Sequence, residues 1–269
     1  MPELPEVEFA RRSLERWLAH ERVVRAQADP TRIFRGANPK QFVSLRGRLV
    51  QARRRGKYLL LAFEHGQGLL SHLGMTGKWV RRPAGVREPY SRARLFLEGG
   101  EVVHYRDPRM FGRLEPLSAE GLDALPVVRA LGVDPLVDGL TAKTLAAAVG
   151  PSRQALKVAL LDQGRVAGLG NIHAAEALYR AHLHPSRKPP SLTPAEWRAL
   201  RNGILATFRL ALKDAGQEEA EEIAYVEEGG HNPFLVYGRA GEPCRRCQTP
   251  LEAFTQAGRT THFCPRCQA

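Results

Sequence analysis

The chain begins MPELPEVE, and Pro2 and Glu3 are the first residues whose types can do chemistry. Once Met1 is removed, Pro2 carries a secondary amine. With a pKa near ~7.8, about a quarter of such amines are free base at pH 7.4, against roughly one lysine in a thousand. A free secondary amine can attack an electrophilic sugar carbon and form an iminium ion, which promotes elimination. Glu3 lies beside it as an acid or a charge stabiliser, but many chains begin Met-Pro, so the pair alone decides nothing.

The cysteines form a second chemical constellation. All four lie in the last 26 residues, as Cys244-x2-Cys247 and Cys264-x2-Cys267 with 16 residues between the pairs. This spacing is typical of a zinc site; two disulfides are the alternative, which a reducing compartment disfavours. Four thiolates leave no open coordination position. The sequence therefore predicts one structural zinc ion that holds a small hairpin together.

Net charge points to the partner. The chain carries a formal charge of +12 with pI ≈ 10.1. Arginine suits bidentate binding of phosphate, so nucleic acid is the leading partner, and a solvated basic surface is the alternative. Basic residues are dense from Arg46 to Lys57. Residues 218–228, in contrast, hold six Glu and no Lys or Arg.

The elements that must position these groups begin with a helix. From Pro5 onward, apolar residues recur at spacings of three and four, which predicts an amphipathic helix with Pro5 at its first position. On this interpretation Pro2 and Glu3 contribute nothing to the helix cap. Residues 23–115 then read mostly as short strands, whose frequency predicts a β-sandwich or barrel. The strand-like runs are VVRAQA, RLVQARR, KYLLLAF, GLLSHL, RARLFLE and EVVHYRD.

From about residue 118 the sequence becomes rich in Ala and Leu, which is typical of helices, and GVDPLVDG at 132–139 resembles a linker. Thr193-Pro194-x-Glu196 combines an N-cap, an N1 proline and a glutamate at N3. LLDQGRVAGLGNIHAAEALYRA reads as a helix, glycine-punctuated turns and a second helix. No run of 18 apolar residues and no signal-peptide h-region is present, so we expect a soluble intracellular protein.

Seven stretches follow one another along the chain: MPELPEVE at the start, RRGKYLLL at 54–61, SHLGMTG at 71–77, DPRMFGR at 107–113, LLDQGRVAGLGNIHAAEAL at 160–178, VYGRAGEPC at 236–244 and the four-cysteine hairpin. In this order they resemble the formamidopyrimidine-DNA glycosylase (Fpg, MutM) family from the first residue to the last. The resemblance implies a bifunctional DNA glycosylase that excises oxidised bases and then cuts the strand.

The same resemblance assigns the reacting groups. Pro2 is implied as the Schiff-base nucleophile and Glu3 as the acid that helps to open the sugar. Lys57 and Arg259 are implied as proton donors during β- and δ-elimination, and as contacts to backbone phosphate. Their sequence context agrees, because Lys57 follows a basic run and Arg259 lies on the zinc hairpin, where a cation can meet phosphate. The alternative for each is a solvated surface cation.

Excision requires the base to leave the stack, and the hole left behind must be filled. Met75, Arg109 and Phe111 match the family's void-filling wedge. Met and Phe can pack between bases, and Arg can bind the orphaned partner base. Without the resemblance, DPRMFGR would be read as a hairpin turn and Met75 as a core residue.

Further DNA contacts are implied by the resemblance. Asn171 follows GLG and opens a helix whose N-terminus can hold a phosphate. Similar roles are implied for His72, Tyr237 and Arg153, and Tyr90 stands where the family often has a DNA-contacting histidine. For His72 and Tyr237 the alternative is packing in the core or a hairpin.

Two features depart from the family pattern. Relatives usually show two adjacent arginines before the wedge phenylalanine, whereas this chain has Arg109-Met110. In members that remove 8-oxoguanine, the capping segment tends to be rich in Gly or Thr, Lys and aromatic residues, whereas residues 217–235 here are acidic. Phosphate repels such a segment, which leaves the preferred lesion open.

We therefore expect an α+β protein whose N-terminal helix-flanked β-sandwich (1–132) precedes a helix-two-turn-helix DNA-binding domain (133–235) and a zinc-finger hairpin (236–269). The expected partner of this monomeric, non-membrane protein of the bacterial cytoplasm and nucleoid is double-stranded DNA with damaged bases or abasic sites, held in a basic cleft between the domains. The alternatives are a Nei-like enzyme for oxidised pyrimidines, a lyase restricted to abasic sites, and a non-catalytic binder of damaged DNA. The opposite base and the balance of β- over δ-elimination are left open.

Overall fold

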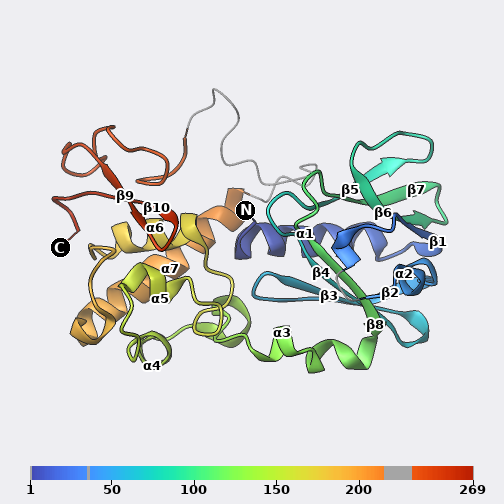
Figure 1. The fold of residues 1–269 in the computed structure, drawn as a ribbon, viewed down its shortest axis with the longest axis horizontal. Coiled ribbons are helices and arrows are strands. Elements are labelled where there is room, and N and C mark those ends of the chain that lie inside the picture. The colour runs from blue at the N-terminus through green and yellow to red at the C-terminus, as the bar shows by residue number, and fades with distance from the viewer. Residues whose placement is uncertain (1, 35–36, 215–231, 269) are drawn as a thin grey trace. The chain divides into compact units, whose positions relative to one another are not determined.

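The computed structural model describes residues 2–34, 37–214 and 232–268 (Figure 1). The chain forms two compact units, one ending at Arg129 and the next beginning at Ala130. Each has an apolar core of its own. In the described part of the chain, no helix combines the length and apolar character that crossing a membrane requires.

The first unit is built on antiparallel strands in the order β5-β7-β6-β1-β2-β3-β4-β8. β1 and β2 pair only at Arg22 with Arg48 and Val23 with Gly47, so the strands divide there into two halves. Both halves and the first helix bury side chains in one core, which confirms the helix-flanked β-sandwich. The strands are β1 (Arg22–Ala28), β2 (Gly47–Arg55), β3 (Tyr58–Phe63), β4 (Gln67–His72), β5 (Lys78–Pro83), β6 (Ser91–Leu97), β7 (Glu101–Arg106) and β8 (Arg113–Ser118).

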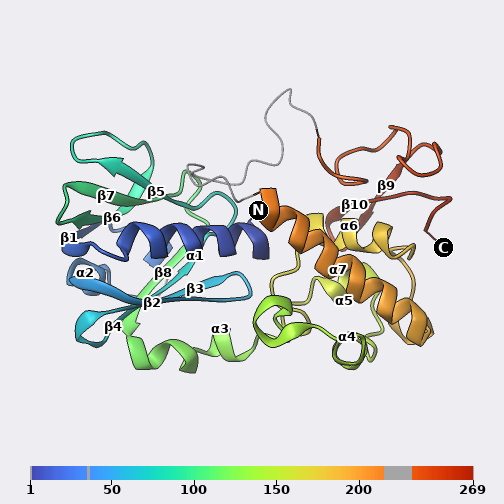
Figure 2. The ribbon, with the colours of Figure 1, turned by 180° about the vertical axis from the view of Figure 1, so that it is seen from behind.

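Helix α1 (Leu4–Leu18) runs between the β5–β6–β7 half and the β2–β3–β4 half (Figure 2). It begins one residue before Pro5, and the expectation that Glu3 takes no part in the cap was wrong. Glu3 is the N-cap, and its backbone N–H donates to the Glu6 carboxylate at 2.9 Å in a capping box. The acidic first turn therefore fixes the backbone next to Pro2. Two short helices complete the unit, α2 (Pro39–Val43) and α3 (Pro126–Arg129).

All six predicted strand runs are strands, but β5 and β8 were not predicted. These two lie at the ends of the strand order, where one edge of each has no neighbouring strand. Edge strands tolerate charge and proline, and KWVRRP and RLEPLS contain both. These two segments therefore lack the apolar or alternating pattern from which the other strands were predicted.

The second unit is helical and contains the predicted helix-two-turn-helix. α5 ends at Leu160 and α6 begins at Asn171, and the Gln163 side chain holds the turns between them. Its amide donates to the carbonyls of Leu161 and Leu169 at 2.9 and 2.8 Å, and its oxygen accepts from the N–H of Gly168 at 2.9 Å. The helices are α4 (Ala142–Val149), α5 (Leu156–Leu160), α6 (Asn171–Arg180) and α7 (Pro194–Asp214).

The segment between the sandwich and these helices is ordered. Gly132 and Val133 donate backbone hydrogen bonds to the carbonyls of Gln163 and Arg165 at 2.9 and 3.2 Å. Near the C-terminus, β9 (Glu252–Gln256) and β10 (Arg259–Phe263) form the predicted hairpin. The segments that flank the hairpin share an apolar core with Tyr179 of α6, so the hairpin is packed within the second unit.

Candidate nucleic-acid interface and metal centre

Pro2 and Glu3 lie at the N-terminal end of α1. Pro2 is half-buried, and Glu3 is only 1% exposed. A glutamate is rarely buried this deeply unless it is paired, and the Glu3 carboxylate accepts a hydrogen bond from the Glu6 N–H in the capping box. The cap of a packed helix thus holds a shielded carboxyl group in the residue next to Pro2.

Lys57 lies in the turn between β2 and β3 and is 7% exposed, so it is not a solvated surface cation. The turn is fixed from α1: Glu8 accepts a hydrogen bond from Nε of Arg54 at 3.2 Å, and Nη1 of Arg54 donates to the Gly56 carbonyl at 3.0 Å. The Arg54 side chain is 2% exposed. The helix that carries Pro2 and the turn that carries Lys57 are therefore linked by one buried ion pair.

Part of the basic run before Lys57 is used inside the first unit. Arg53 forms an ion pair with Asp123 at 2.8 Å, and Arg48 donates to the His20 carbonyl at 2.9 Å. From charge density alone, such a run could be either a contact to nucleic acid or a solvated basic surface. In the structure, Arg48, Arg53 and Arg54 instead hold neighbouring segments together.

Met75, Arg109 and Phe111 lie on two turns of the first unit. Met75 is 45% exposed between β4 and β5, while Arg109 and Phe111 lie between β7 and β8. The Arg109 guanidinium lies over the Phe111 ring at 4.6 Å. Met110, the departure from the family pattern, packs against the main core. An apolar residue at this position is thus explained by packing.

His72 and Tyr90 border these turns. The His72 ring accepts a hydrogen bond from the Gly74 N–H at 3.1 Å and lies 4.8 Å from the Tyr58 ring. Tyr90 is 54% exposed and has a positive φ of 60°, which is uncommon for a bulky residue. The carbonyl of Tyr90 accepts from the Asp107 N–H at 3.0 Å, so its exposed ring stands on a fixed backbone.

In the second unit, Asn171 opens α6 and Arg259 is exposed at the start of β10. The ammonium of Lys157 donates to Asn171 Oδ1 at 2.5 Å and to the Thr260 carbonyl at 3.2 Å. Asn171 Nδ2 also donates to that carbonyl, at 3.0 Å. Lys157 is 1% exposed, and a lone lysine in ALKVAL gave no signal of this role in the sequence.

The backbone of Tyr237 is fixed by a hydrogen bond to Glu176. The buried carboxylate of Glu176 accepts from the N–H groups of Leu235, Val236 and Tyr237 at 2.9 to 3.1 Å. The Tyr237 ring lies 5.2 Å from the His262 ring of β10. Glu176 was not singled out in the sequence, because a glutamate in a helix pattern is ordinary. Arg153 is exposed, and its carbonyl accepts from Lys188 at 3.0 Å.

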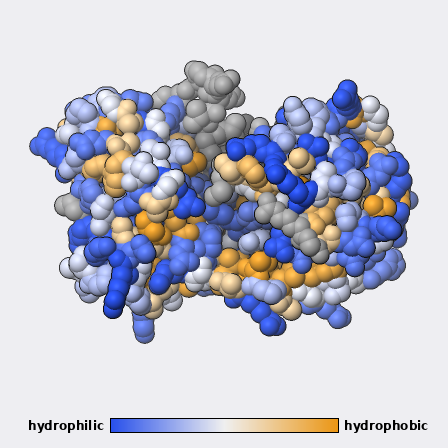
Figure 3. All heavy atoms as spheres, in the orientation of Figure 1, coloured by the Kyte–Doolittle hydropathy of each residue, from blue (hydrophilic) through white to orange (hydrophobic). Residues whose placement is uncertain are grey.

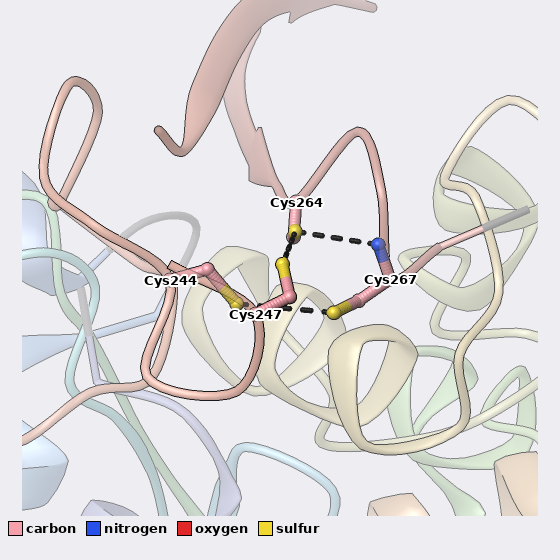
Figure 4. A group of neighbouring side chains, drawn as sticks. All are labelled: Cys244, Cys247, Cys264 and Cys267. Atoms are coloured by element: carbon pink, nitrogen blue, oxygen red, sulfur yellow. Dashed lines mark hydrogen bonds between the residues drawn. The ribbon is translucent and has the colours of Figure 1, made fainter. Parts of the chain in front are cut away.

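The four cysteines converge, with all Sγ atoms within 4.8 Å of one another (Figure 4). Tetrahedral zinc with Zn–S near ~2.3 Å separates sulfurs by about 3.8 Å. The sulfurs of Cys244 and Cys267 are 3.9 Å apart, and those of Cys247 and Cys264 are 3.5 Å apart. Hydrogen bonds from Thr249 lower the pKa of Cys247 to about 6, whereas burial raises the pKa of Cys264 and of Cys267, so the case for a metal site rests on the geometry of the four sulfurs. These four residues fit one structural zinc ion, as predicted.

The candidate residues divide between the units. Pro2, Glu3, Lys57 and the Met75, Arg109 and Phe111 turns belong to the first, whereas Arg153, Asn171, Tyr237, Arg259 and the cysteines belong to the second. Residues 217–231, which include all six glutamates of this acidic segment, lie outside the described residues. Its expected effect on lesion preference therefore stays a prediction.

The sandwich, the helix-two-turn-helix and the four-cysteine hairpin, in this order, define a DNA glycosylase of base excision repair. Residues 1–114 match the formamidopyrimidine-DNA glycosylase N-terminal domain, 131–221 the H2TH domain of the same enzymes, and 241–269 the zinc finger found in FPG and IleRS. The chain belongs to the formamidopyrimidine-DNA glycosylase family.

Full-length relatives agree. Formamidopyrimidine-DNA glycosylase of Roseiflexus sp. (strain RS-1) is 39% identical over 274 residues, covering all of both chains. The crystal structure of MutM (Fpg) from Thermus thermophilus has a TM-score of 0.83 at 36% identity, covering 99% of this chain and 98% of that one. Lactococcus lactis Fpg in complex with DNA containing an abasic site has a TM-score of 0.88 at 30% identity, covering 99% of both.

Proposed function

We propose that this glycosylase is bifunctional, excising oxidised bases from double-stranded DNA and then cutting the strand through a Schiff base on Pro2. The observation that carries the proposal is the ion pair that connects α1 with the turn that holds Lys57. An N-terminal secondary amine, the buried Glu3 and the buried Lys57 belong to two elements that the Arg54–Glu8 ion pair links. Relatives crystallised with Fapy-dG and abasic-site DNA support the substrate class.

The chemistry begins at the Pro2 nitrogen. Its lone pair attacks C1′ of the damaged nucleotide, the bond from C1′ to the base breaks, and the base leaves with the electron pair and takes up a proton. The attacking nitrogen then loses its N–H proton. As Glu3 donates a proton to the ring oxygen, the bond from C1′ to that oxygen breaks, and the nitrogen lone pair forms the C1′=N⁺ bond of the iminium ion. Because proline is a secondary amine, this ion stays cationic at every pH.

Elimination follows from that charge. The iminium withdraws electrons from C2′, a proton leaves C2′, and the 3′ C–O bond breaks as phosphate departs (β-elimination). Loss of the 5′ phosphate is the δ step. Lys57 and Arg259 are the proposed proton donors and phosphate contacts for these steps. The proposed contacts to the DNA backbone are Asn171, which Lys157 holds, the exposed Arg153 and Tyr90, and the partly buried Tyr237 and His72.

Base extrusion is assigned to Met75, Arg109 and Phe111, which would fill the void and bind the orphaned base. The chain is proposed to act as a monomer on the bacterial chromosome. The domain boundaries at 132 and 235 are part of the same proposal.

Borohydride trapping tests the nucleophile. Reduction in the presence of duplex with an abasic site should yield a covalent complex, and peptide mass spectrometry should place the link on Pro2. The control is the same chain with one extra residue left before Pro2, which should bind the duplex but not be trapped. A link mapped to a lysine, or trapping of the extended chain, would contradict the proposal. Binding without any trapping would favour a non-catalytic damage binder.

A further inference from the structure

Two turns of the first unit carry the proposed wedge, and they come from different strand pairs. Met75 lies in the turn 73–77 after β4, and Arg109 with Phe111 lies in the segment 107–112 after β7. To fill a single void in DNA, these three side chains must keep a fixed mutual arrangement. The structure shows what holds the two turns together.

The Asp107 carboxylate joins them. Oδ1 accepts hydrogen bonds from the Thr76 hydroxyl at 2.6 Å and from the Met110 N–H at 3.0 Å, and Oδ2 accepts from the Gly112 N–H at 2.8 Å. Asp107 is fully buried, with 0% exposure. Thr76 is adjacent to Met75, while Met110 stands between Arg109 and Phe111. One buried carboxylate thus contacts the immediate neighbours of all three wedge residues.

The turns also approach each other closely at glycines. A Cβ at Gly74, whose φ is +62°, would lie 2.4 Å from the Phe111 carbonyl carbon, and one at Gly112 would lie 1.8 Å from the Tyr105 hydroxyl. That hydroxyl donates to the His72 carbonyl at 2.9 Å. Such contacts leave no room for the turns to shift independently.

Arg32 also holds the 107–112 segment, through hydrogen bonds to its backbone carbonyls. Nη2 of Arg32 donates to the Arg109 carbonyl at 2.5 Å, and Nε donates to the Met110 carbonyl at 3.1 Å. Met110 has a left-handed φ of 54°, which costs free energy unless its surroundings fix it. Asp107 at its N–H and Arg32 at its carbonyl supply that constraint.

We propose that Asp107 is a positioning residue that presets Met75, Arg109 and Phe111 as one rigid wedge before DNA is bound. This inference rests on the proposed function only for the role of those three side chains. Ordering a loose turn during insertion would cost conformational entropy for each backbone residue that becomes fixed. A prearranged wedge avoids that cost at the moment when the base leaves the stack.

The test removes one hydrogen bond and leaves every wedge side chain in place. Thr76→Val is nearly isosteric but lacks the hydroxyl that reaches Asp107, and Thr76→Ser retains the hydroxyl and serves as the matched control. The probe is duplex carrying a stable abasic analogue with 2-aminopurine beside it, whose fluorescence rises on unstacking. Stopped-flow measurement then reports wedge insertion without requiring any bond to break.

We expect Thr76→Val to insert about tenfold more slowly, corresponding to one lost hydrogen bond to a charged group, and Thr76→Ser to stay within about threefold of the parent. Equal insertion rates for Thr76→Val and the parent would overturn the inference. So would equal slowing in the Ser and Val variants, since the hydroxyl would then be irrelevant. Failure of the parent to be trapped by borohydride would instead contradict the Pro2 chemistry, while the insertion rates would still decide the role of Asp107.

Discussion

Buried charged residues mark where the structure adds most to the sequence. Lys57, Asp107, Lys157 and Glu176 are each at most 7% exposed. A buried charge is costly unless it is paired or hydrogen-bonded, so each must make contacts that repay its desolvation. The hydrogen bonds described above for Asp107, Lys157 and Glu176 all fall on segments that carry a candidate DNA-binding residue. Rigid support for the interface is therefore built from charges inside the protein.

Glu8 offers a prediction with a defined pH dependence. Burial alone would raise the pKa of Glu8, but hydrogen bonds and charge from Arg11, with the charge of Arg54, lower it below the usual 4.5. A carboxyl group with a lowered folded-state pKa stabilises the fold above its unfolded-state pKa, and this contribution is lost as the pH falls through the folded-state pKa. Glu8→Gln should therefore be destabilised by about 2 kcal/mol at pH 7.

Urea unfolding at pH 7, 5 and 3 measures this difference, which should shrink as the pH falls below about 4.5. The control is Glu15→Gln on the same helix, which removes an exposed partner of Arg11 and should cost less than about 0.5 kcal/mol. A Glu8→Gln deficit that stays constant from pH 7 to pH 3 would show that packing, not charge, is responsible.

Lys157 should support DNA binding without touching DNA. Lys157→Met keeps the length of the side chain but removes the donor that fixes Asn171 Oδ1 and the Thr260 carbonyl. We expect about a tenfold loss of affinity for an abasic-analogue duplex, measured by fluorescence anisotropy. Lys143→Met, at an exposed position on α4, is the control. If Lys157 acts through Asn171, adding Asn171→Ala to Lys157→Met should weaken binding little further.

At the scale of elements, the zinc hairpin is the clearest case of structure that depends on a ligand. The four cysteines that fit one zinc ion flank β9 and β10, and Arg259 stands on that hairpin. Chelation or Cys264→Ser should therefore abolish DNA binding by disordering the hairpin, while the first unit stays folded. One zinc per chain by metal analysis, and recovery of binding when zinc is returned to the chelated protein, are the expected results. Full DNA affinity in metal-free protein would contradict this.

The elements themselves could largely be predicted. Periodicity found α1, six strands and the helix-two-turn-helix because burial on one face leaves a regular apolar pattern. β5 and β8 escaped because edge strands need no such pattern. The cap at Glu3 was missed because glutamate is not a common N-cap, and the reciprocal hydrogen bonds between Glu3 and Glu6 appear only in the structure.

The site was predictable where residue type carries the chemistry. The paired CxxC motif predicted the zinc site directly, whereas Met-Pro at the start of a chain is common, and the roles of Pro2 and the other candidates came from the family resemblance. Asp107, Lys157 and Glu176 were not predictable, since each has at least one partner that lies far along the chain. The Thr76–Asp107 bond spans 31 residues, and the Lys157–Thr261 bond spans 104. Such pairings are fixed by the tertiary fold and leave no local signal.

At the scale of the whole molecule, positive charge dominates. The chain carries +12, and the face drawn in Figure 3 is largely hydrophilic, with apolar side chains in smaller patches. Several arginines are neutralised inside a unit, as with Arg53 on Asp123 and Arg54 on Glu8. Binding to DNA should thus depend on particular unneutralised cations as well as on net charge.

Salt dependence separates these two kinds of arginine. Each phosphate neutralised by a protein cation releases counterions, so the slope of log K against log salt changes by about 0.9 per contact in duplex DNA. Arg259→Ala should make the slope shallower by about that amount, because Arg259 is exposed and is proposed to contact phosphate. Arg53→Ala also removes one positive charge, but its guanidinium is held by Asp123 at 2.8 Å, so its slope should match the parent. Titration of an abasic-analogue duplex between 50 and 300 mM salt, about the range where such slopes are measured, gives both values. Equal changes in the two variants would mean that net charge alone governs binding, and an unchanged slope in Arg259→Ala would remove Arg259 from the phosphate contacts.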